Sequence, residues 1–220
     1  MSVVGQEEEK VFSVGEWRIS FRYKRDAGRS FLNCVAISPL TPFEAEILKV
    51  SLGIPMEWSY DDRSKTVELW ISPLHKAEPR KIESEIISTL VRVVPELARE
   101  LSMERFREKL AERGWIVSVE GSRVAARRSL HVGRKHIGYV EAEVAESGGL
   151  FRGEIIVVIL AETWERSQEL AARLSAGLKV PPVSEFPFLR FRVIIREGIL
   201  PQVEEQIINV FKIVRREVLR

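Results

Sequence analysis

The segment PQVEEQIINVFKIVRREV, residues 201–218, repeats the pattern of PRKIESEIISTLVRVV, residues 79–94. In both segments a proline opens the run, and apolar residues follow at the three- and four-residue spacing of an amphipathic helix. The matched positions are Ile82, Glu83, Ile86, Ile87, Leu90 and Val93 against Val203, Glu204, Ile207, Ile208, Phe211 and Val214. We therefore expect each segment to be the closing helix of a similar unit.

Earlier blocks repeat in the same order, about 121 to 126 residues apart. They are Ile19, Phe21 and Tyr23 against Val140, Ala142 and Val144; Ala45, Leu48 and Leu52 against Ala171, Leu174 and Leu178; and Val67, Leu69 and Ile71 against Leu189, Phe191 and Val193. A period this long predicts two copies of a whole domain. The alternative is a chance likeness between two α+β domains, because the register drifts between blocks.

The first copy reads as alternating strands and amphipathic helices. Expected elements are strands at 17–24 and 31–37 joined by a turn at 26–28, a helix at 42–52 capped by Thr41, a hairpin of 56–60 with 66–72, and a helix at 79–101 that Pro95 should kink or split. The pair Asp61 and Asp62 is expected to form the hairpin turn rather than a catalytic site.

The second copy reads in a similar order. Expected elements are a helix at 103–113, an added hairpin of 115–120 with 123–130, strands at 136–145 and 153–161, a helix at 163–178, a strand at 189–196 and a helix at 201–219. Because residues 155–160 are apolar without alternation, that strand should be central and covered on both faces.

These elements predict an α+β protein with two tandem repeats, residues 1–101 and 102–220. Each repeat should be an antiparallel sheet with helices packed on one face, in the order β-β-α-β(β)-α. The two copies are expected to form an intrachain pseudo-dimer, so that the protein is a monomer of this kind or a homodimer.

Composition narrows the function classes. The 220 residues hold 34 basic and 32 acidic side chains, a net charge of +2, so no overall bias toward nucleic acid or an anionic membrane is expected.

Cys34 is the single cysteine and sits in an apolar strand, which favours a buried structural thiol. The start of the chain lacks a signal-peptide pattern, and no apolar run approaches the roughly 20 residues of a membrane helix. We expect a cytoplasmic protein.

Asparagine occurs twice and glutamine four times beside abundant charge, which is typical of a protein from a thermophile. The sequence has no phosphate-binding loop, dinucleotide fingerprint or serine-hydrolase elbow. Its three histidines are His75, His131 and His136, of which the last two form at most a weak ligand pair. We predict a non-enzymatic protein without catalytic residues, cofactor or metal; a site at the seam between the copies stays open as an alternative.

One segment, residues 123–136, concentrates positive charge. Its basic residues are Arg123, Arg127, Arg128, Arg134 and Lys135. Such a hairpin could bind phosphates of a nucleic acid. The other interpretation is an exposed sheet edge that charge protects from aggregation, and the segment has no interleaved aromatic residues.

Other candidates are expected on the sheet faces opposite the helices. Trp58 and Trp70 in the first copy, and Arg190 and Arg192 in the second, are predicted to point outward. An outward tryptophan requires a contact that covers it. The structural interpretation is that the other repeat or a second molecule of the protein covers it. The functional interpretation is that a bound polypeptide does. Tryptophan and arginine are common anchors in protein interfaces, so these four residues are the candidate protein-binding site.

Three passages carry a resemblance to a known fold. They are FREKLAERGWIVSVE at 106–120, LKVSLGIPMEWSYDDRSKTVELWISPL at 48–74 and PQVEEQIINVFKIVRREV at 201–218. Together the chain resembles the type III secretion chaperone-like fold, particularly the YbjN-type group, in two tandem units. The first copy lacks an evident opening helix, and the hairpin before Leu189 is reduced. The resemblance implies a non-enzymatic protein that binds other proteins and pairs as a dimer.

We therefore predict a cytoplasmic protein-binding module, chaperone-like or regulatory, with a protein partner. The alternative is a nucleic-acid-binding protein that uses residues 123–136.

Overall fold

The computed structural model describes residues 7–26, 29–72, 78–147 and 150–220. The predicted turns around residues 27–28 and 148–149, and His75, lie outside the described residues. The chain divides into two compact units, Met1–Ser102 and Met103–Arg220, and each holds one antiparallel sheet with helices. The α+β class is therefore confirmed.

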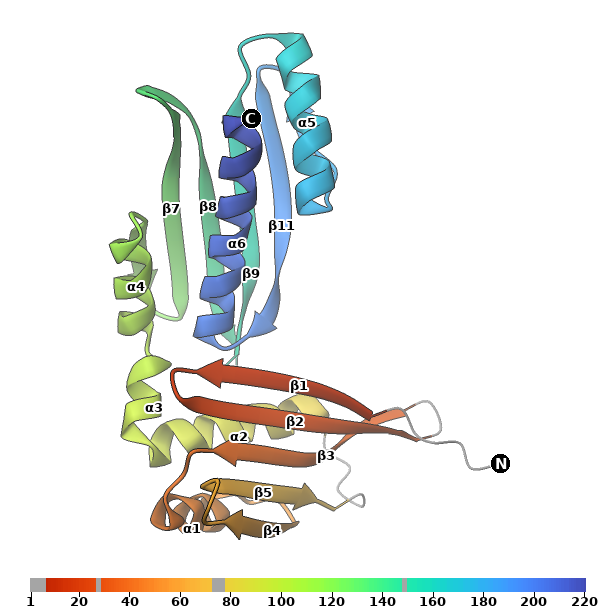
Figure 1. The fold of residues 1–220 in the computed structure, drawn as a ribbon, viewed down its shortest axis with the longest axis vertical. Helices are drawn as coiled ribbons and strands as arrows, with labels where there is room; N and C mark the ends of the chain where they lie inside the picture. The colour runs from red at the N-terminus through yellow and green to blue at the C-terminus, as the bar shows by residue number, and fades with distance from the viewer. Residues whose placement is uncertain (1–6, 27–28, 73–77, 148–149) are drawn as a thin grey trace. The chain divides into compact units, whose positions relative to one another are not determined.

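The first unit contains a five-stranded sheet in the order β1-β2-β3-β5-β4. Its elements are β1 (Glu7–Val14), β2 (Trp17–Asp26), β3 (Arg29–Ser38), α1 (Pro42–Ser51), β4 (Met56–Asp61), β5 (Thr66–Ile71), α2 (Pro79–Val93) and α3 (Pro95–Glu100). Phe21, Val35 and Leu69 of the sheet and Ile86 and Leu90 of α2 are fully buried. The core of this unit therefore lies between the sheet and α2, which are stacked in Figure 1.

The helix cap, the helix break and the hairpin turn predicted for the first unit all occur. The Thr41 hydroxyl accepts a hydrogen bond from the Glu44 amide at 3.2 Å, and the Glu44 carboxylate accepts one from the Thr41 amide at 2.7 Å, which is a capping box. Pro95 separates α2 from α3. Asp61 accepts hydrogen bonds from the Ser64 hydroxyl at 2.6 Å and the Arg63 amide at 3.1 Å. These bonds lower the pKa of Asp61 and close the β4–β5 turn.

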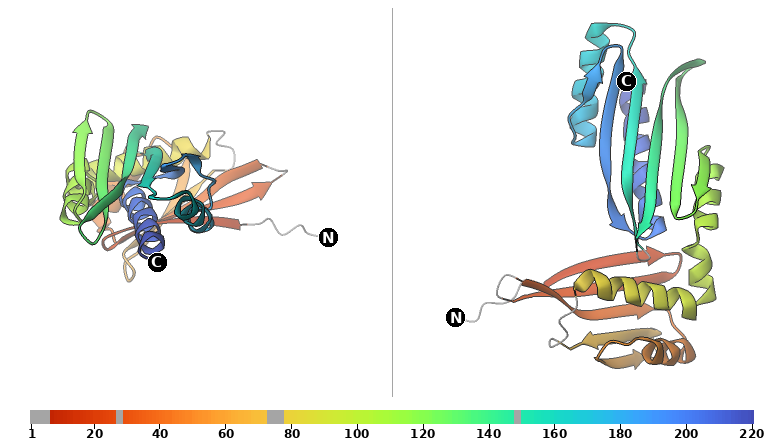
Figure 2. Two further views of the ribbon diagram at one scale, coloured as in Figure 1. Left: turned by 90° about the horizontal axis from the view of Figure 1, so that it is seen from above. Right: turned by 180° about the vertical axis from the view of Figure 1, so that it is seen from behind.

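The second unit contains a six-stranded sheet in the order β10-β11-β9-β8-β7-β6. Its elements are α4 (Met103–Glu112), β6 (Ile116–Glu120), β7 (Arg123–Val132), β8 (Lys135–Ser147), β9 (Leu150–Leu160), α5 (Trp164–Leu178), β10 (Val183–Glu185), β11 (Phe188–Gly198) and α6 (Leu200–Leu219). Val140, Val157 and Phe191 pack with Val203 and Ile207 of α6 in one buried cluster. The rear view of Figure 2 shows β9 and β11 in front of α6, so α6 covers one face of the sheet.

β1 is a strand that the sequence patterns did not predict. Residues 7–10 are charged, and their pattern does not predict a strand. In the structure, β1 nevertheless pairs with β2 over its whole length and buries Phe12 and Val14. The predicted hairpin of 115–120 with 123–130 forms as β6 and β7. β1 pairs with β2 at the edge of the first sheet, as β7 pairs with β8 in the second. In the described part of the chain, no helix is both long and apolar enough to cross a membrane.

Candidate functional site

The strands β9 and β11 present an apolar row on the face turned away from α6. Their ladder pairs Leu160 with Phe188 and Val158 with Arg190, and these side chains alternate with the buried set that contacts the helices. We call the surface the outer patch, and it consists of Ile156, Val158, Leu160, Val183, Phe188, Arg190, Arg192 and Ile194. β9 is central in its sheet as predicted, but no described helix of the second unit covers this face.

The outer patch exposes large apolar side chains around Val158, which is itself only 7% exposed. Val183 is 70% exposed, Ile194 65%, Phe188 46% and Leu160 40%. At the same end of the sheet Trp164, 56% exposed, packs edge-to-face on Phe186 at a ring-centroid distance of 6.0 Å. Clustered exposed apolar side chains of this size are typical of a surface that contacts another protein. The sequence patterns did not single out Phe188, Ile194 or Trp164.

The two arginines of the outer patch differ in their pairing. Arg192 donates to the carboxylate of Glu154 on β9. Arg190 is exposed and makes no ion pair with a described residue. The patch therefore combines apolar side chains with an available cation, a combination that suits a partner segment carrying both apolar and acidic side chains.

The edge beside the outer patch is partly open. β10 pairs only with Phe188, Leu189 and Arg190 of β11. Farther along, the Gln206 side chain bonds both the amide and the carbonyl of Arg196, at 2.8 and 3.0 Å. Between these two protected places β11 has no strand partner on that side among the described residues. An extended peptide could pair there.

The predicted tryptophans lie on different faces. Trp70 on β5 points outward, as predicted, and is 40% exposed. Trp58 does not: it lies opposite Leu69, whose side chain is fully buried, and the Lys49 ammonium of α1 sits 4.4 Å from its ring centre. The placement of Trp58 on the outward face is therefore wrong, because cross-strand partners share a face and α1 covers this one.

Cys34 is fully buried in β3, opposite Trp70. Burial raises the pKa of its thiol to about 11, and the nearby Arg22 cation lowers the pKa only in part. At neutral pH the thiol is protonated, which agrees with a structural role and not with a nucleophile.

The basic segment 123–136 does not form one surface. Arg123 and Arg127 point to the outer side, where the Arg127 guanidinium stacks on Tyr139 at 3.7 Å, whereas Arg128 points to the helix side. Arg134 and Lys135 lie at the turn between β7 and β8, and Lys135 pairs with Glu162. The pattern of alternation along β7 divides the charges between two faces.

His131 and His136 pack against each other at the β7–β8 turn, with ring centroids 5.2 Å apart. No group of three or more His, Cys, Asp or Glu side chains placed to hold a metal ion occurs among the described residues.

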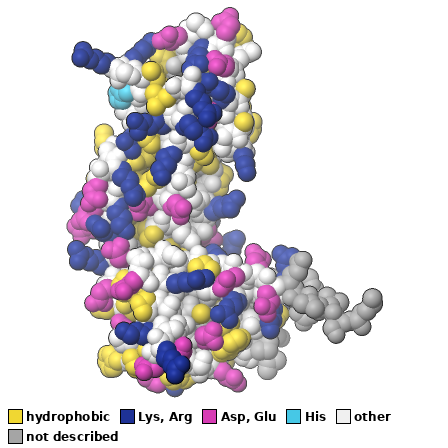
Figure 3. Space-filling view, viewed as in Figure 1, with side chains coloured by type: hydrophobic (Ala, Val, Ile, Leu, Met, Phe, Trp, Pro, Cys, Tyr) yellow, Lys and Arg dark blue, Asp and Glu magenta, His cyan; other side chains and the backbone are white. Residues whose placement is uncertain are grey.

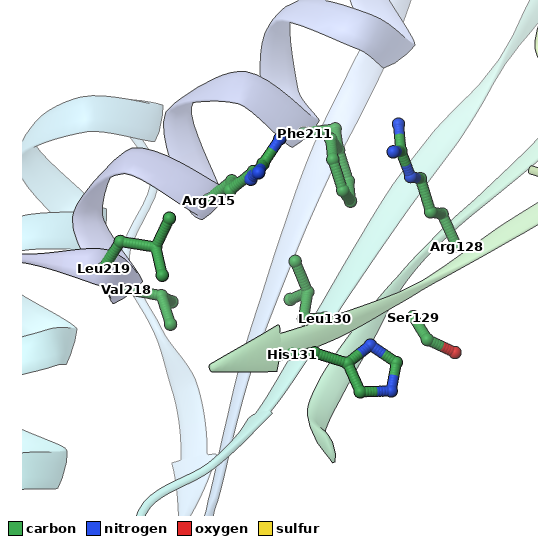
Figure 4. A pocket seen from close by; sticks show the side chains of 8 residues that line it. All are labelled: Arg128, Ser129, Leu130, His131, Phe211, Arg215, Val218 and Leu219. Carbon is green, nitrogen blue, oxygen red and sulfur yellow. The ribbon is translucent and has the colours of Figure 1, made fainter. Parts of the chain in front are cut away.

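A groove on the helix side of the second unit brings together residues distant in sequence. Two adjoining hollows, of about 190 and about 560 Å³, share Arg128 of β7 and Phe211 and Arg215 of α6. Trp115 and Lys212 also line the larger hollow. Figure 4 shows Arg128 and Phe211 side by side, with Arg215 extending from α6 toward the same space. Figure 3 shows many Lys and Arg side chains on this side of the unit.

The two aromatic rings form the inner wall of this groove. Trp115 and Phe211 pack edge-to-face at 5.5 Å and are 4% and 6% exposed. The Arg128 guanidinium lies 4.2 Å from the Phe211 ring centre. Its burial, and then the nearby Arg215 charge, lower the pKa of Arg128.

Comparison with known proteins gave no match to any protein family, curated protein or solved structure.

Proposed function

We propose that this chain is a non-enzymatic protein-binding module, chaperone-like or regulatory, and that the outer patch is its binding surface. The observation that carries the proposal is that no described helix covers this face of β9 and β11, where Leu160, Phe188 and Ile194 are exposed. The apolar run at 155–160 is typical of a strand with cover on both faces, and the described helices of the second unit lie on only one. A bound polypeptide would supply the missing cover.

The partner segment would be extended and would alternate apolar with acidic side chains. Its apolar side chains would contact Leu160, Phe188 and Ile194, and a carboxylate would pair with Arg190. Its backbone would pair along the open edge of β11.

Affinity capture with three forms of the full chain tests the proposal. The wild type should retain partner proteins that the Leu160→Asp/Phe188→Asp variant loses, because two carboxylates in the outer patch oppose apolar contact. Ile116→Asp is the matched control, since Ile116 is 79% exposed on β6, at the opposite edge of the same sheet. A photoreactive residue at position 188 should crosslink to the same partner. Identical captured proteins for all three forms would exclude the outer patch.

We also propose that the two units are tandem copies of one domain, in a type III secretion chaperone-like, YbjN-type fold. The support is the common strand order, β1-β2-β3-β5-β4 beside β7-β8-β9-β11-β10. The ladders pair Val35 with Leu69 and Val157 with Phe191, and the repeat aligns Leu69 with Phe191. α4 and β6 are additions of the second unit.

The tandem copies would form a pseudo-dimer within one chain, in the cytoplasm. Residues 1–102 and 103–220, produced as separate chains, should then associate one to one in size-exclusion chromatography with light scattering. Two species that stay separate at high concentration would contradict the pseudo-dimer.

The alternative, a nucleic-acid-binding protein, stays a prediction. Its test is binding that falls steeply with salt and that Arg127→Glu/Arg128→Glu abolishes. The division of the segment between two sheet faces makes the outer patch the stronger candidate.

A further inference from the structure

The groove between β7 and α6 gathers positive charge without matching negative charge. Arg128, Lys212 and Arg215 line it, and none of the three makes an ion pair with a described residue. The fourth basic residue, Arg113, is already paired with Glu204, whose side chain is only 10% exposed. One acidic side chain, Glu112, also lines the groove. Three available cations beside one carboxylate leave an excess of about two positive charges.

The cations are also positioned to act together. The Arg128 guanidinium lies over the Phe211 ring, 4.2 Å from its centre, which restrains its position and leaves N–H groups that can donate to a ligand. Arg215 lies one turn after Phe211 on α6 and faces the same hollow. Two like charges in one groove repel each other, and an anion that accepts from both guanidinium groups would remove this repulsion.

We propose that this groove binds the phosphate group of a small molecule, held between Arg128 and Arg215 with Lys212 as the third cation. A phosphate monoester carries about −1.5 to −2 charges at neutral pH, which matches the excess in the groove better than a single carboxylate does. The two hollows have room for a phosphate and a small organic group beside it. The site is separate from the outer patch and does not depend on the proposed protein partner.

The aromatic residues of the groove favour a small molecule over a nucleic acid strand. Proteins that bind single strands stack successive bases on exposed aromatic faces. Trp115 and Phe211 are 4% and 6% exposed and already pack on each other, so they offer no such faces. The groove therefore supplies charge without a stacking platform.

Titration of the full chain with inorganic phosphate and then pyrophosphate tests the site, with chloride holding the ionic strength constant. For the wild type the unfolding temperature should rise with phosphate concentration, because binding to the folded state stabilises it. Arg128→Gln and Arg215→Gln should each weaken binding about tenfold or more. Arg152→Gln is the control: Arg152 is exposed on β9 and does not line the groove, and its affinity should stay that of the wild type.

A second measurement separates a ligand site from a structural role. In buffer without phosphate, Arg215→Gln should be at least as stable as the wild type, since it removes a like-charge neighbour of Arg128. A large loss of stability for Arg215→Gln without phosphate, or wild-type phosphate affinity in both groove variants, would overturn the proposal. A short oligothymidylate that binds more tightly than pyrophosphate, and needs both arginines, would also overturn it in favour of a nucleic acid.

Discussion

Glu83 and Glu204 are both buried near the start of the closing helix of their own unit, and each pairs with a basic side chain from elsewhere in that unit. Glu83 is 3% exposed and accepts hydrogen bonds from the Lys10 ammonium, at 2.6 Å, and from the Tyr23 hydroxyl. Glu204 is 7% exposed and pairs with Arg113. A buried carboxylate persists only when it is paired and hydrogen-bonded. The first pair therefore fixes α2 on β1 and β2, and the second joins α6 to the end of α4.

Replacement of Glu83 by alanine should lower the free energy of unfolding of the first unit by about 1–3 kcal/mol, because the buried Tyr23 hydroxyl loses its acceptor. Glu204→Ala should cost less, since its partner Arg113 is half exposed and can be solvated by water. Calorimetric unfolding of the full chain measures both changes. Glu57→Ala, at an exposed position of β4, should stay within about 0.5 kcal/mol of the wild type. Equal effects for Glu57→Ala and Glu83→Ala would contradict the role of the buried pair.

Tyr23 makes the stability of the first unit sensitive to alkaline pH. Burial, and then the hydrogen bond to Glu83, raise the pKa of Tyr23 above its ordinary value. Tyrosine in the unfolded chain ionises near pH ~10, whereas folded Tyr23 keeps its proton, so its contribution is complete below about pH 10 and is lost as the pH rises further. Denaturant unfolding between about pH 8 and 11 should show a smaller decline for Tyr23→Phe than for the wild type. Parallel declines would show that another group causes the loss.

The thiol of Cys34 should react slowly in the folded protein, because it is buried. Because burial raises the pKa of Cys34 to about 11, the thiolate fraction at pH 8 is roughly a hundredfold lower than for a thiol of ordinary pKa. Cys34 should therefore react slowly with a thiol-disulfide reagent in the folded protein and rapidly in denaturant. A native rate close to the denatured rate would mean that β3 opens easily.

The sequence predicts elements that have local causes. The Thr41 cap, the Pro95 break and the Asp61 turn each depend on residues within one turn or hairpin, and each occurs as predicted. β1 could not be predicted in this way, because pairing with β2 and two buried side chains hold it while residues 7–10 are charged. Trp58 shows the same limit, since its face depends on the partner strand.

Strand alternation also leaves register open. The sequence repeat aligns Ile19 with Val140. In the ladders, Val140 pairs with Val157, and the residue that pairs with Val35, taken as the corresponding position in the first unit, is Phe21. The residue that corresponds to Val140 is then Phe21, two residues from Ile19. A slip of two keeps every side chain on its face, so a hydrophobic pattern of period two cannot detect it.

The two candidate sites also differ in how far the sequence predicts them. The apolar run at 155–160 pointed to a strand needing cover on both faces, and the outer patch is built on it. The groove was not predictable, because Arg128 and Arg215 come from a strand and a helix that only the folded sheet brings together.

Gly153 provides a test of the sheet beneath the outer patch. It lies in β9 opposite Val144 of β8, and a Cβ at this position would overlap the carbonyl oxygen of Glu143, which belongs to the backbone and cannot move aside. Gly153→Ala should therefore lower the free energy of unfolding by about 2–3 kcal/mol, in the upper part of the range for overpacked positions.

Gly121→Ala is the matched control for Gly153→Ala. Gly121 has a positive φ of 60° at the β6–β7 turn, and no atom lies near the position of its missing Cβ. Alanine there should cost only the strain of the left-handed backbone, about 1–2 kcal/mol. Denaturant unfolding of the full chain compares the two variants. If Gly153→Ala were the milder of the two, β8 and β9 would not approach as closely as the ladder requires. The apolar row of β9 would then lack the rigid support on which its alignment with β11 depends.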